Sequence, residues 1–555
     1  MERIVECVPN ISEGRRPEVI QAIAAVVETV EGIRLLDVDP GRSTNRTVIT
    51  FAGPPEAVGE AAFRLIREAA ERIDMRHHTG EHPRMGATDV CPFVPVRGVT
   101  MDECVEIARA LGERVGRELG IPGYYYERAA TREEFSNLAH CRKGQYEGLA
   151  KLAQPEWAPD FGPAAFTDRV RSTGAVAIGA RDFLVAYNVN LNTTSTRWAN
   201  AVAFDIRETG RVVKHPDGTS ERVPGSLRAV KGIGWFIEEY GIAQLSLNLT
   251  DLSVTPVHVA FDEACARAAD RGIRVTGSEL VGLVPLRVLT DAADHYLTRQ
   301  RRSLGIPVAE KIHIAVKSLG LDDLAPFVPE ERVIEYLLQP AADGPLVSKN
   351  LRGFAEATAS ESPAPGGGSV AAYCGAIGAA LAGMVANLSA HKRGWEDRWQ
   401  KFSEVAVRAQ DVREQLLRAV DEDTAAFNAI LAAYGLPQGD DAARAARQTA
   451  IATATATATA VPFRVAEVAC GALDLALDMA RSGNPNSVTD AGVAALALRA
   501  AVRGAVLNVR VNAAGLSPEV ASAWEARCAA CVAEADRLEA EVLAAVDAVL
   551  ASAVA

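Results

Sequence analysis

The sequence has little positive charge for its length, few cysteines and no region biased toward disorder. Its 58 Lys and Arg residues are outnumbered by 71 Asp and Glu residues, which gives a formal net charge of −13. This balance argues against general nucleic-acid or acidic-membrane binding, and anionic small molecules would need local clusters of Arg and Lys. The nine cysteines are scattered along 555 residues, which indicates reduced cytosolic thiols and no disulfide framework.

No targeting segment is apparent at the N-terminus. MERIVECVPNISEG lacks a charged region followed by a long apolar one, so we expect no secretory signal and a cytoplasmic location. The stretch at 370–390, VAAYCGAIGAALAGMVANLSA, approaches the roughly 20 residues that cross a bilayer. Because it is rich in Gly and Ala and has few large aliphatic residues, we expect a buried helix of a bundle instead.

The chain is too long for one hydrophobic core and changes character along its length. Its first part alternates β-rich runs such as NRTVITFAG with amphipathic patterns such as PPEAVGEAAFRLIREAAERI. Beyond PAADGPLVSKN, residues 340–350, strands disappear and Ala-rich helical patterns follow, so TATATATATA at 451–460 is expected to be helical. We predict a multidomain protein with two α/β (α+β) subdomains and then an all-α helical bundle. The predicted boundaries are 1–178, 179–330, a linker at 331–350, and 351–555.

Three of the nine histidines lie in RHHTGEHPRMGATDVCPFVPV, residues 76–96. His78 and His82 have the i, i+4 spacing of metal ligands on a helix, but Gly80 and Pro83 make a helix improbable there. HTGEHP also resembles a zinc-finger linker, although the required upstream CxxC is missing. The pattern favours a loop that presents His82. A histidine there fits either a proton carrier or an ordinary exposed or packing residue, and the local pattern does not favour the proton carrier.

A second polar segment, LLDVDPGRSTNRT, ends a predicted strand with Asp37 and Asp39. The turn that follows carries Arg42 and Arg46. A carboxylate that orients a histidine, together with arginines that bind a substrate carboxylate, would suit an acidic amino-acid substrate. The same residue types are also ordinary turn formers, so both interpretations stay open.

The helical region contains two further candidate segments. In APGGGSVAAYCGAIGAA, residues 364–380, three glycines and Ser369 precede a helix, which fits either a backbone anion site or an ordinary helix start. In LLRAVDEDTAAFNAIL, Asp423 falls on an apolar helical stripe, whereas Asp421 and Glu422 point elsewhere. A carboxylate in such a stripe should have a raised pKa, as a general acid needs, unless it is a structural partner of a neighbouring helix. Asp490, at a predicted helix start, is more typical of a cap.

These segments together resemble one known family. GEHPRMGATDVCPFVPVRGV, VECVPNISEG, LLDVDPGRSTNRTV, GARDFLVAYNVNL, KGIGW and GSELVGLVPL are similar to glutamate formiminotransferase. PGGGSVAA, VDEDTAAFNA and SGNPNSVTDAGVAA are similar to formiminotetrahydrofolate cyclodeaminase. Their order in one chain resembles the bifunctional formimidoyltransferase-cyclodeaminases of histidine degradation.

The resemblance implies two reactions. The formimino group of N-formimino-L-glutamate moves to N5 of tetrahydrofolate, and the product then closes to 5,10-methenyltetrahydrofolate with loss of ammonia. It implies His82 as the transferase acid–base and Asp423 as the cyclodeaminase acid. Supporting candidates are Asp39, Arg46, Asp421 and Asp490. The implied folate-binding residues are Gly179, Ala180, Arg181, Asp182, Phe183, Leu184, Val185, Ala186, Tyr187 and Asn188, with Gly366, Gly367, Gly368 and Ser369 in the second domain.

The resemblance also implies partners. Tetrahydrofolate, polyglutamylated, would be a co-substrate with formiminoglutamate, no metal is expected, and the chain would form a homo-oligomer built from dimers, with neither nucleic acid nor membrane as a partner. Three alternatives remain. They are a metal-dependent hydrolase using His77, His78, His82 and Asp89, a transferase whose helical domain serves only assembly, and a non-enzymatic folate-storage module.

Overall fold

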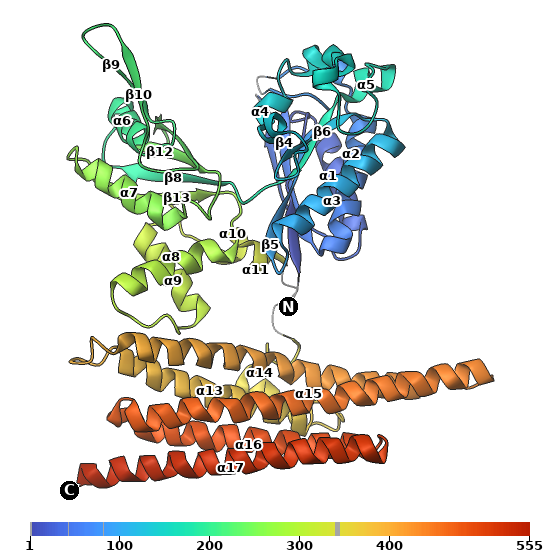
Figure 1. Ribbon diagram of the computed structural model, residues 1–555, viewed down its shortest axis with the longest axis vertical. Helices are drawn as coiled ribbons and strands as arrows, with labels where there is room; N and C mark the ends of the chain where they lie inside the picture. The colour runs from blue at the N-terminus through green and yellow to red at the C-terminus, as the bar shows by residue number, and fades with distance from the viewer. Residues whose placement is uncertain (1–2, 43, 81–82, 339–343, 555) are drawn as a thin grey trace. The chain divides into compact units, whose positions relative to one another are not determined.

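The computed structural model describes residues 3–42, 44–80, 83–338 and 344–554. The chain divides into two compact units. The first comprises Met1–Leu289 and Leu319–Gln339, and the second comprises Thr290–Ser318 and Pro340–Ala555. The predicted fold class, with α/β elements before an all-helical region, is confirmed (Figure 1).

A seven-stranded mixed sheet forms the first part of the α/β unit. Its strands are β1 (Ile4–Cys7), β2 (Asn10–Ile11), β3 (Arg34–Gly41), β4 (Arg46–Gly53), β5 (Thr88–Arg97), β6 (Gly123–Glu127) and β7 (Val176–Ala180). Strand β5 pairs antiparallel with β1 and β2 and parallel with β7, which also pairs parallel with β6. Strand β3 pairs with β4. Because β7 belongs to this sheet, the sheet extends to residue 180, two residues into the predicted second subdomain.

Helices pack on this sheet with their apolar stripes. They are α1 (Pro17–Ala25), α2 (Pro55–Arg72) and α3 (Met101–Arg114), and two short helices follow, α4 (Leu138–Cys141) and α5 (Asp168–Thr173). In α2 the buried residues recur at helical spacing, from Val58 through Leu65 to Ala69, and they join the core formed with Ile49 and Phe51 of β4. Helix α3 begins at a capping box in which Thr100 and Glu103 each bond the other's backbone N–H.

A four-stranded antiparallel sheet forms the second part of this unit, in the order β11-β12-β8-β13. Its strands are β8 (Val185–Leu191), β11 (Val230–Ile237), β12 (Ile242–Leu249) and β13 (Val275–Val281), with helices α6 (Thr196–Ile206) and α7 (Val257–Ala269). A separate exposed hairpin consists of β9 (Arg211–Lys214) and β10 (Ser220–Val223). Short helices α10 (Pro329–Arg332) and α11 (Ile334–Leu338) return to the unit, where Ile334 N donates to Val284 O at 3.0 Å.

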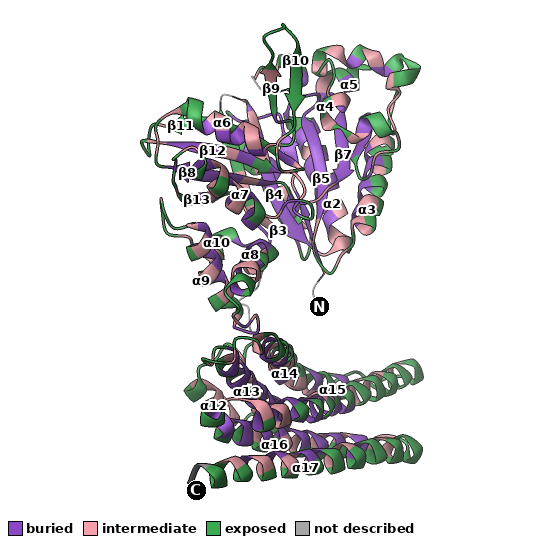
Figure 2. Ribbon diagram, turned by 60° about the vertical axis from the view of Figure 1, so that its left-hand side comes forward, coloured by how far each residue is buried: buried purple, intermediate pink, exposed green. Residues whose placement is uncertain are grey.

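The second unit is a bundle of long helices whose inner faces are buried (Figure 2). Its elements are α12 (Leu351–Thr358), α13 (Gly367–Ala390), α14 (Trp399–Tyr434), α15 (Asp441–Ser482), α16 (Val488–Ala513) and α17 (Pro518–Val554). Helices α8 (Leu286–Arg299), for most of its length, and α9 (Val308–Leu319) also belong to it. Small residues allow close approach between α13 and α16, since a Cβ on Gly378 would lie 2.8 Å from Leu498 Cγ.

Two sequence expectations about the helices are confirmed. The TATATATATA run lies within α15, and Thr449, Thr457 and Thr459 each donate a hydroxyl hydrogen bond to the carbonyl four residues earlier. The apolar stretch at 370–390 is part of α13. Helix α13 and the segment Pro485–Ala513 are long and apolar enough to cross a membrane, but 61% and 50% of their apolar windows are buried in the protein.

Candidate functional sites in the two units

The α/β unit contains a cavity of about 930 Å³. Its wall includes residues from both sheets, among them Tyr126 at the end of β6 and Lys231 on β11. Five basic side chains line it, Arg128, Arg142, Lys143, Arg181 and Lys231, together with three acidic ones, Glu127, Asp182 and Asp251. This local excess of positive charge, in a chain of net charge −13, suits an anionic ligand.

The predicted folate-binding stretch, Gly179–Asn188, contributes to this cavity. It leaves β7 at Ala180 and enters β8 at Val185, and Arg181, Asp182 and Leu184 line the cavity between the two strands. Leu184 is 45% exposed, whereas Phe183 is buried. The Asp182 carboxylate accepts hydrogen bonds from Arg287 Nη2 at 2.8 Å and from Phe183 N at 2.7 Å. Its charge is therefore offset by Arg287, within the same unit.

His82 and Glu81 lie outside the described residues, and Gly80 and Pro83 border this gap. Asn45 Nδ2 donates to Thr79 O at 2.9 Å, and a Cβ on Gly80 would overlap the carbonyl oxygen of Thr44. After the gap, Pro83 lines the 930 Å³ cavity. The chain at Thr79 and Gly80 is thus held against the turn after β3, and Pro83 reaches the cavity.

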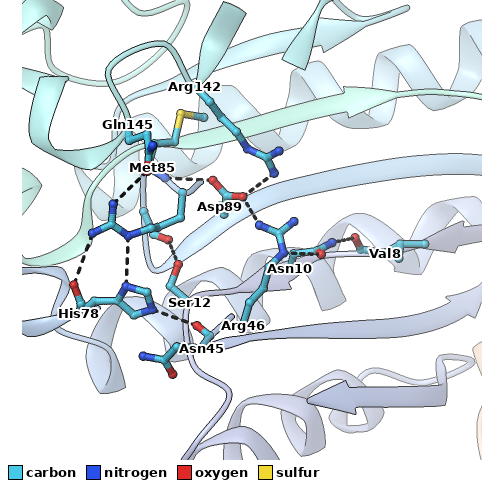
Figure 3. A network of polar contacts seen from close by, with 12 residues as sticks. Val8, Asn10, Ser12, Asn45, Arg46, His78, Met85, Asp89, Arg142 and Gln145 are labelled. Atoms are coloured by element: carbon cyan, nitrogen blue, oxygen red, sulfur yellow. Dashed lines mark hydrogen bonds and ion pairs between the residues drawn. The ribbon is translucent and has the colours of Figure 1, made fainter. Parts of the chain in front are cut away.

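His78 takes part in a polar network beside this segment (Figure 3). Its Nδ1 accepts from Arg84 Nε at 3.2 Å, so Nε2 carries the hydrogen and donates to Asn45 O at 2.9 Å. Burial and the Arg84 cation lower the pKa of His78, with the bond to Asn45 acting in the opposite direction. Arg84 itself pairs with Glu147 at 2.7 Å. His78 is therefore a neutral imidazole with a structural role, whereas the side chain of His77 is 83% exposed.

Asp89 is the buried centre of the same network (Figure 3). It is 0% exposed and accepts from Met85 N at 3.0 Å, from Arg142 Nη2 at 2.5 Å and from Arg46 Nη1. The metal-hydrolase alternative required His78 and Asp89 as metal ligands. Both ring nitrogens of His78 are engaged by Arg84 and Asn45, and the Asp89 carboxylate accepts from Met85 N and the two arginines. The predicted supporting residue Arg46 thus joins the network, whereas Asp39 lies exposed on strand β3.

In the helical unit, the glycine-rich turn and Asp423 come together. Ser369, fully buried near the start of α13, places its Oγ 2.7 Å from Val420 O and 3.2 Å from Asp423 Oδ2 on α14. A Cβ on Gly368 would overlap the Asp423 carboxylate, so only glycine permits this approach. Burial raises the pKa of Asp423, although hydrogen bonds from the Ser369 side chain and backbone act in the opposite direction. This is the half-buried carboxylate with raised pKa that the helical stripe predicted.

The other two predicted carboxylates of this unit lie elsewhere. Asp421 accepts from Leu346 N at 2.9 Å and from Val347 N at 3.2 Å, so it anchors the segment that leads into the bundle. Asp490 lies in the first turn of α16. That helix runs antiparallel to α13, because a Cβ on Gly367 would lie 3.3 Å from Asn508 Nδ2. At the other end of α13, Asn484 N donates to Ser389 Oγ at 2.8 Å.

Within one chain, Asp490 and the Asp423 cluster therefore lie at opposite ends of the bundle. The 18 residues from Asp490 to Asn508 span roughly 27 Å of helix.

Three family models together match most of the chain. The model described as "Formiminotransferase domain, N-terminal subdomain" matches residues 4–181, "Formiminotransferase domain" matches 186–339, and "Formiminotransferase-cyclodeaminase" matches 350–547. The formimidoyltransferase-cyclodeaminase of Rattus norvegicus is 43% identical over 522 residues, which cover 94% of each chain. The chain belongs to the formimidoyltransferase-cyclodeaminase family.

Shorter relatives match the two parts of this family member separately. Glutamate formimidoyltransferase of Streptococcus pyogenes is 43% identical over 298 residues, 54% of this chain and 94% of the relative. Methenyltetrahydrofolate cyclohydrolase of Methylorubrum extorquens is 41% identical over 169 residues, 30% of this chain and 81% of the relative. The finer domain boundaries near 178 and 331–350 stay predictions.

Sequence reasoning missed several cavity residues in the formiminotransferase region. Arg142 and Lys143 follow the short helix α4 in a segment without a clear periodic pattern, and Arg128 follows β6, a strand that the sequence pattern did not single out. The only local signal was the clustering of basic residues in CRKGQ, at residues 141–145. Lys231 stood in the KGIGW motif, but its position on a cavity wall depends on the pairing of β11 with β12.

Proposed function

We propose that this chain carries out both reactions of its family. It transfers the formimino group of N-formimino-L-glutamate to N5 of tetrahydrofolate, and it converts 5-formiminotetrahydrofolate to 5,10-methenyltetrahydrofolate with release of ammonia. The observation that carries this proposal is the similarity to bifunctional relatives along 94% of both chains. The α/β unit would perform the transfer and the helical unit the ring closure.

We assign the proton transfers of the first reaction to His82. When N5 attacks the formimino carbon, it must lose its proton, and the departing glutamate nitrogen must gain one. A single histidine can perform both steps because the unperturbed pKa of an imidazole lies near neutrality. Pro83, the next residue, lines the basic cavity, which supports an acid–base at this position facing an anionic substrate.

Tetrahydrofolate would bind along Gly179–Asn188. Arg181 and Leu184 of this stretch offer a cation and an exposed apolar side chain to the cavity, as a ligand with an aromatic ring system and a carboxylate tail requires. We further propose that the folate is polyglutamylated, because additional basic residues, Arg128 and Lys231, lie on the same cavity wall.

We assign the second reaction to Asp423. In ring closure N10 attacks the formimino carbon, and the former imino nitrogen leaves as ammonia once it is protonated. A carboxyl group whose pKa is raised by burial can hold that proton near neutral pH and give it to the departing nitrogen. The turn at Gly366–Ser369, which contacts Asp423 through Ser369, would hold part of the folate.

We also propose that the chain forms homo-oligomers through the helical unit and works in the cytoplasm. The antiparallel helices α13 and α16 each have an exposed apolar stripe, which a second copy would cover. The stripes are Ile377, Met384 and Leu388 on α13, and Val493, Leu496, Leu507 and Val511 on α16. A two-fold axis perpendicular to these helices would bring Asp490 of a second copy toward the Asp423 end, which would give Asp490 a place in the site.

The proposed function is tested with purified full-length protein, formiminoglutamate and tetrahydrofolate. Glutamate, ammonia and the absorbance of methenyltetrahydrofolate are followed in the same reaction. Ammonia released in equal amount with the methenyl product supports cyclodeamination, whereas glutamate release alone would leave a transferase with an assembly domain. Loss of activity after addition of a chelator would support the metal-dependent hydrolase instead. Binding of folate without turnover would indicate a storage module.

A further inference from the structure

We propose that Arg142 forms a carboxylate-binding subsite in the cavity of the α/β unit and that Asp89 is its positioning residue. The proposal rests on the proposed transferase function, because it concerns the same cavity. Asp89 is completely buried, and its carboxylate lies 2.5 Å from Arg142 Nη2. A buried charge-assisted bond of this kind fixes the direction of a guanidinium much better than an exposed ion pair does.

The guanidinium of Arg142 is fixed by Asp89, but not all of its N–H groups have an acceptor among the described residues. Its side chain is 14% exposed and lines the cavity. Its Nε is buried without a hydrogen-bond acceptor, and among the described residues only Nη2 has a protein partner. The terminal N–H groups that Asp89 does not engage are therefore the donors available to a ligand oxygen or ordered water in the cavity.

Neighbouring arginines of the network do not have the same freedom. Arg84 donates through Nε to His78 and through both terminal nitrogens to Glu147, and it is 8% exposed. Arg46 donates from Nε to Asn10 Oδ1 at 3.0 Å and from Nη1 to Asp89. Arg142 is therefore the member of the network that combines a fixed position with a place on the cavity wall.

The position of Arg142 indicates what it would bind. Pro83, which follows His82, and Gln145 line the same cavity as Arg142. A guanidinium recognises a planar carboxylate through two parallel N–H···O bonds, and both substrates of the proposed transfer carry carboxylates. Because Pro83 lies on the same cavity wall, a carboxylate of formiminoglutamate is favoured, and the glutamate tail of folate is the other source of the same chemistry.

The test compares steady-state kinetics of Arg142→Gln, Arg142→Lys and wild-type full-length protein. The control is Arg117→Gln, which removes a side chain that is 67% exposed and pairs with Glu118. Loss of one charge-assisted contact should raise the KM for formiminoglutamate roughly 10- to 100-fold in Arg142→Gln, with a smaller rise in Arg142→Lys. Both the KM for tetrahydrofolate and the Arg117→Gln control should stay within about twofold of wild type.

Two shortened substrates distinguish the sources of the carboxylate. N-formiminoglycine lacks the side-chain carboxylate of the donor, and tetrahydropteroate lacks the glutamate tail of folate. If the Arg142→Gln effect disappears with N-formiminoglycine, the subsite takes the donor side-chain carboxylate, and if it persists there, it takes the α-carboxylate. If only the KM for tetrahydrofolate rises and the effect disappears with tetrahydropteroate, the subsite takes the folate tail. Unchanged KM values for both substrates overturn the proposal.

Asp89→Asn provides the readout for positioning. It keeps the shape of the side chain but weakens the hold on Arg142, so the donor KM should rise with a smaller change in kcat, and adding this change to Arg142→Gln should have little further effect. Additive effects of the two changes would overturn the role of Asp89. Calorimetric titration with L-glutamate, the transfer product, separates this proposal from the proposed function. Wild-type binding that is lost in Arg142→Gln would support the subsite even without turnover. Glutamate binding equal in all variants, together with an unchanged KM for tetrahydrofolate, would overturn it.

Discussion

The two units build their polar sites from different kinds of structure. In the helical unit, Ser369 and Asp423 face each other from two long packed helices, and a glycine one residue before Ser369 supplies the close approach. In the α/β unit, the network around Asp89 takes residues from strand ends, turns and a loop, including Asn45, His78 and Arg142. Helix spacing alone can place a side chain on a face, whereas strand ends and loops meet only through long-range pairing.

The largest expected difference between the two activities is that caused by His82→Ala. Removal of a general acid–base should reduce formimino transfer about 100- to 10,000-fold. Ring closure of supplied 5-formiminotetrahydrofolate should continue at the wild-type rate, because Asp423 belongs to the helical unit. Separate assays of glutamate release and methenyl formation measure the two rates. Equal loss of both activities would mean that the two sites are not independent.

Gly368→Ala examines the close approach in the helical unit. The new Cβ would overlap the Asp423 carboxylate and displace it, and a misplacement of about 1 Å at a reacting group can cost about 100-fold in rate. We expect ring closure to fall by that order while transfer is retained. Gly471→Ala on α15 is the matched control, because its Cβ would meet no atom within 4 Å. Equal activity of the two variants would show that the approach of Gly368 is unimportant.

Substitutions of Asp421 and Asp423 should have different effects on the stability of the helical unit. Because burial raises the pKa of Asp423 in the folded chain, its ionisation opposes folding as pH rises through that raised value, and below the ordinary range of aspartate no penalty remains. Asp423→Asn should therefore gain thermal stability relative to wild type as the pH increases from about 4 to 8. A stability difference independent of pH would contradict the raised pKa.

Asp421→Asn should instead destabilise the helical unit. Its carboxylate accepts two backbone N–H groups, from Leu346 and Val347, and the weaker amide acceptor should cost about 1–3 kcal/mol in the free energy of unfolding. Denaturant unfolding of the full chain measures this loss. Greater stability in Asp421→Asn than in wild type would remove its role as an anchor.

The smallest effect is expected for His77→Ala. Its side chain is 83% exposed, and its nearest carboxylate partner, Asp74, lies 3.9 Å away. Both activities should stay within about twofold of wild type, as is usual for surface substitutions. A large loss of transfer would give this neighbour of His78 a role in the α/β site that the network of Figure 3 does not provide.

The same contrast explains what the sequence could predict. The helical stripe placed Asp423 on the buried side of α14, and the all-helical region, including the threonine-rich run, was expected from composition and periodicity. The contact between Ser369 and Asp423 was not predicted, because it depends on how α13 packs against α14. Periodicity gives the face of a helix but not its partner.

In the α/β unit, β4 was expected from the run NRTVITFAG, whereas β6 and β11 were not singled out. Gly80 and Pro83 excluded a helical metal site, but the engagement of His78 by Arg84 and Asn45 could not be foreseen from the sequence. Arg142 lies 53 residues from Asp89 in the chain, and nothing local links the two. Their meeting is a property of the folded sheet and its connecting loops.

The most direct test of the account is the product balance of Asp423→Asn with formiminoglutamate and tetrahydrofolate. We predict that glutamate is released at the wild-type rate and that 5-formiminotetrahydrofolate accumulates, because transfer belongs to the α/β unit. The rate at which methenyltetrahydrofolate and ammonia appear should fall at least about 100-fold, because the departing nitrogen has lost the acid that protonates it. Formation of ammonia and methenyltetrahydrofolate at the wild-type rate would contradict the account.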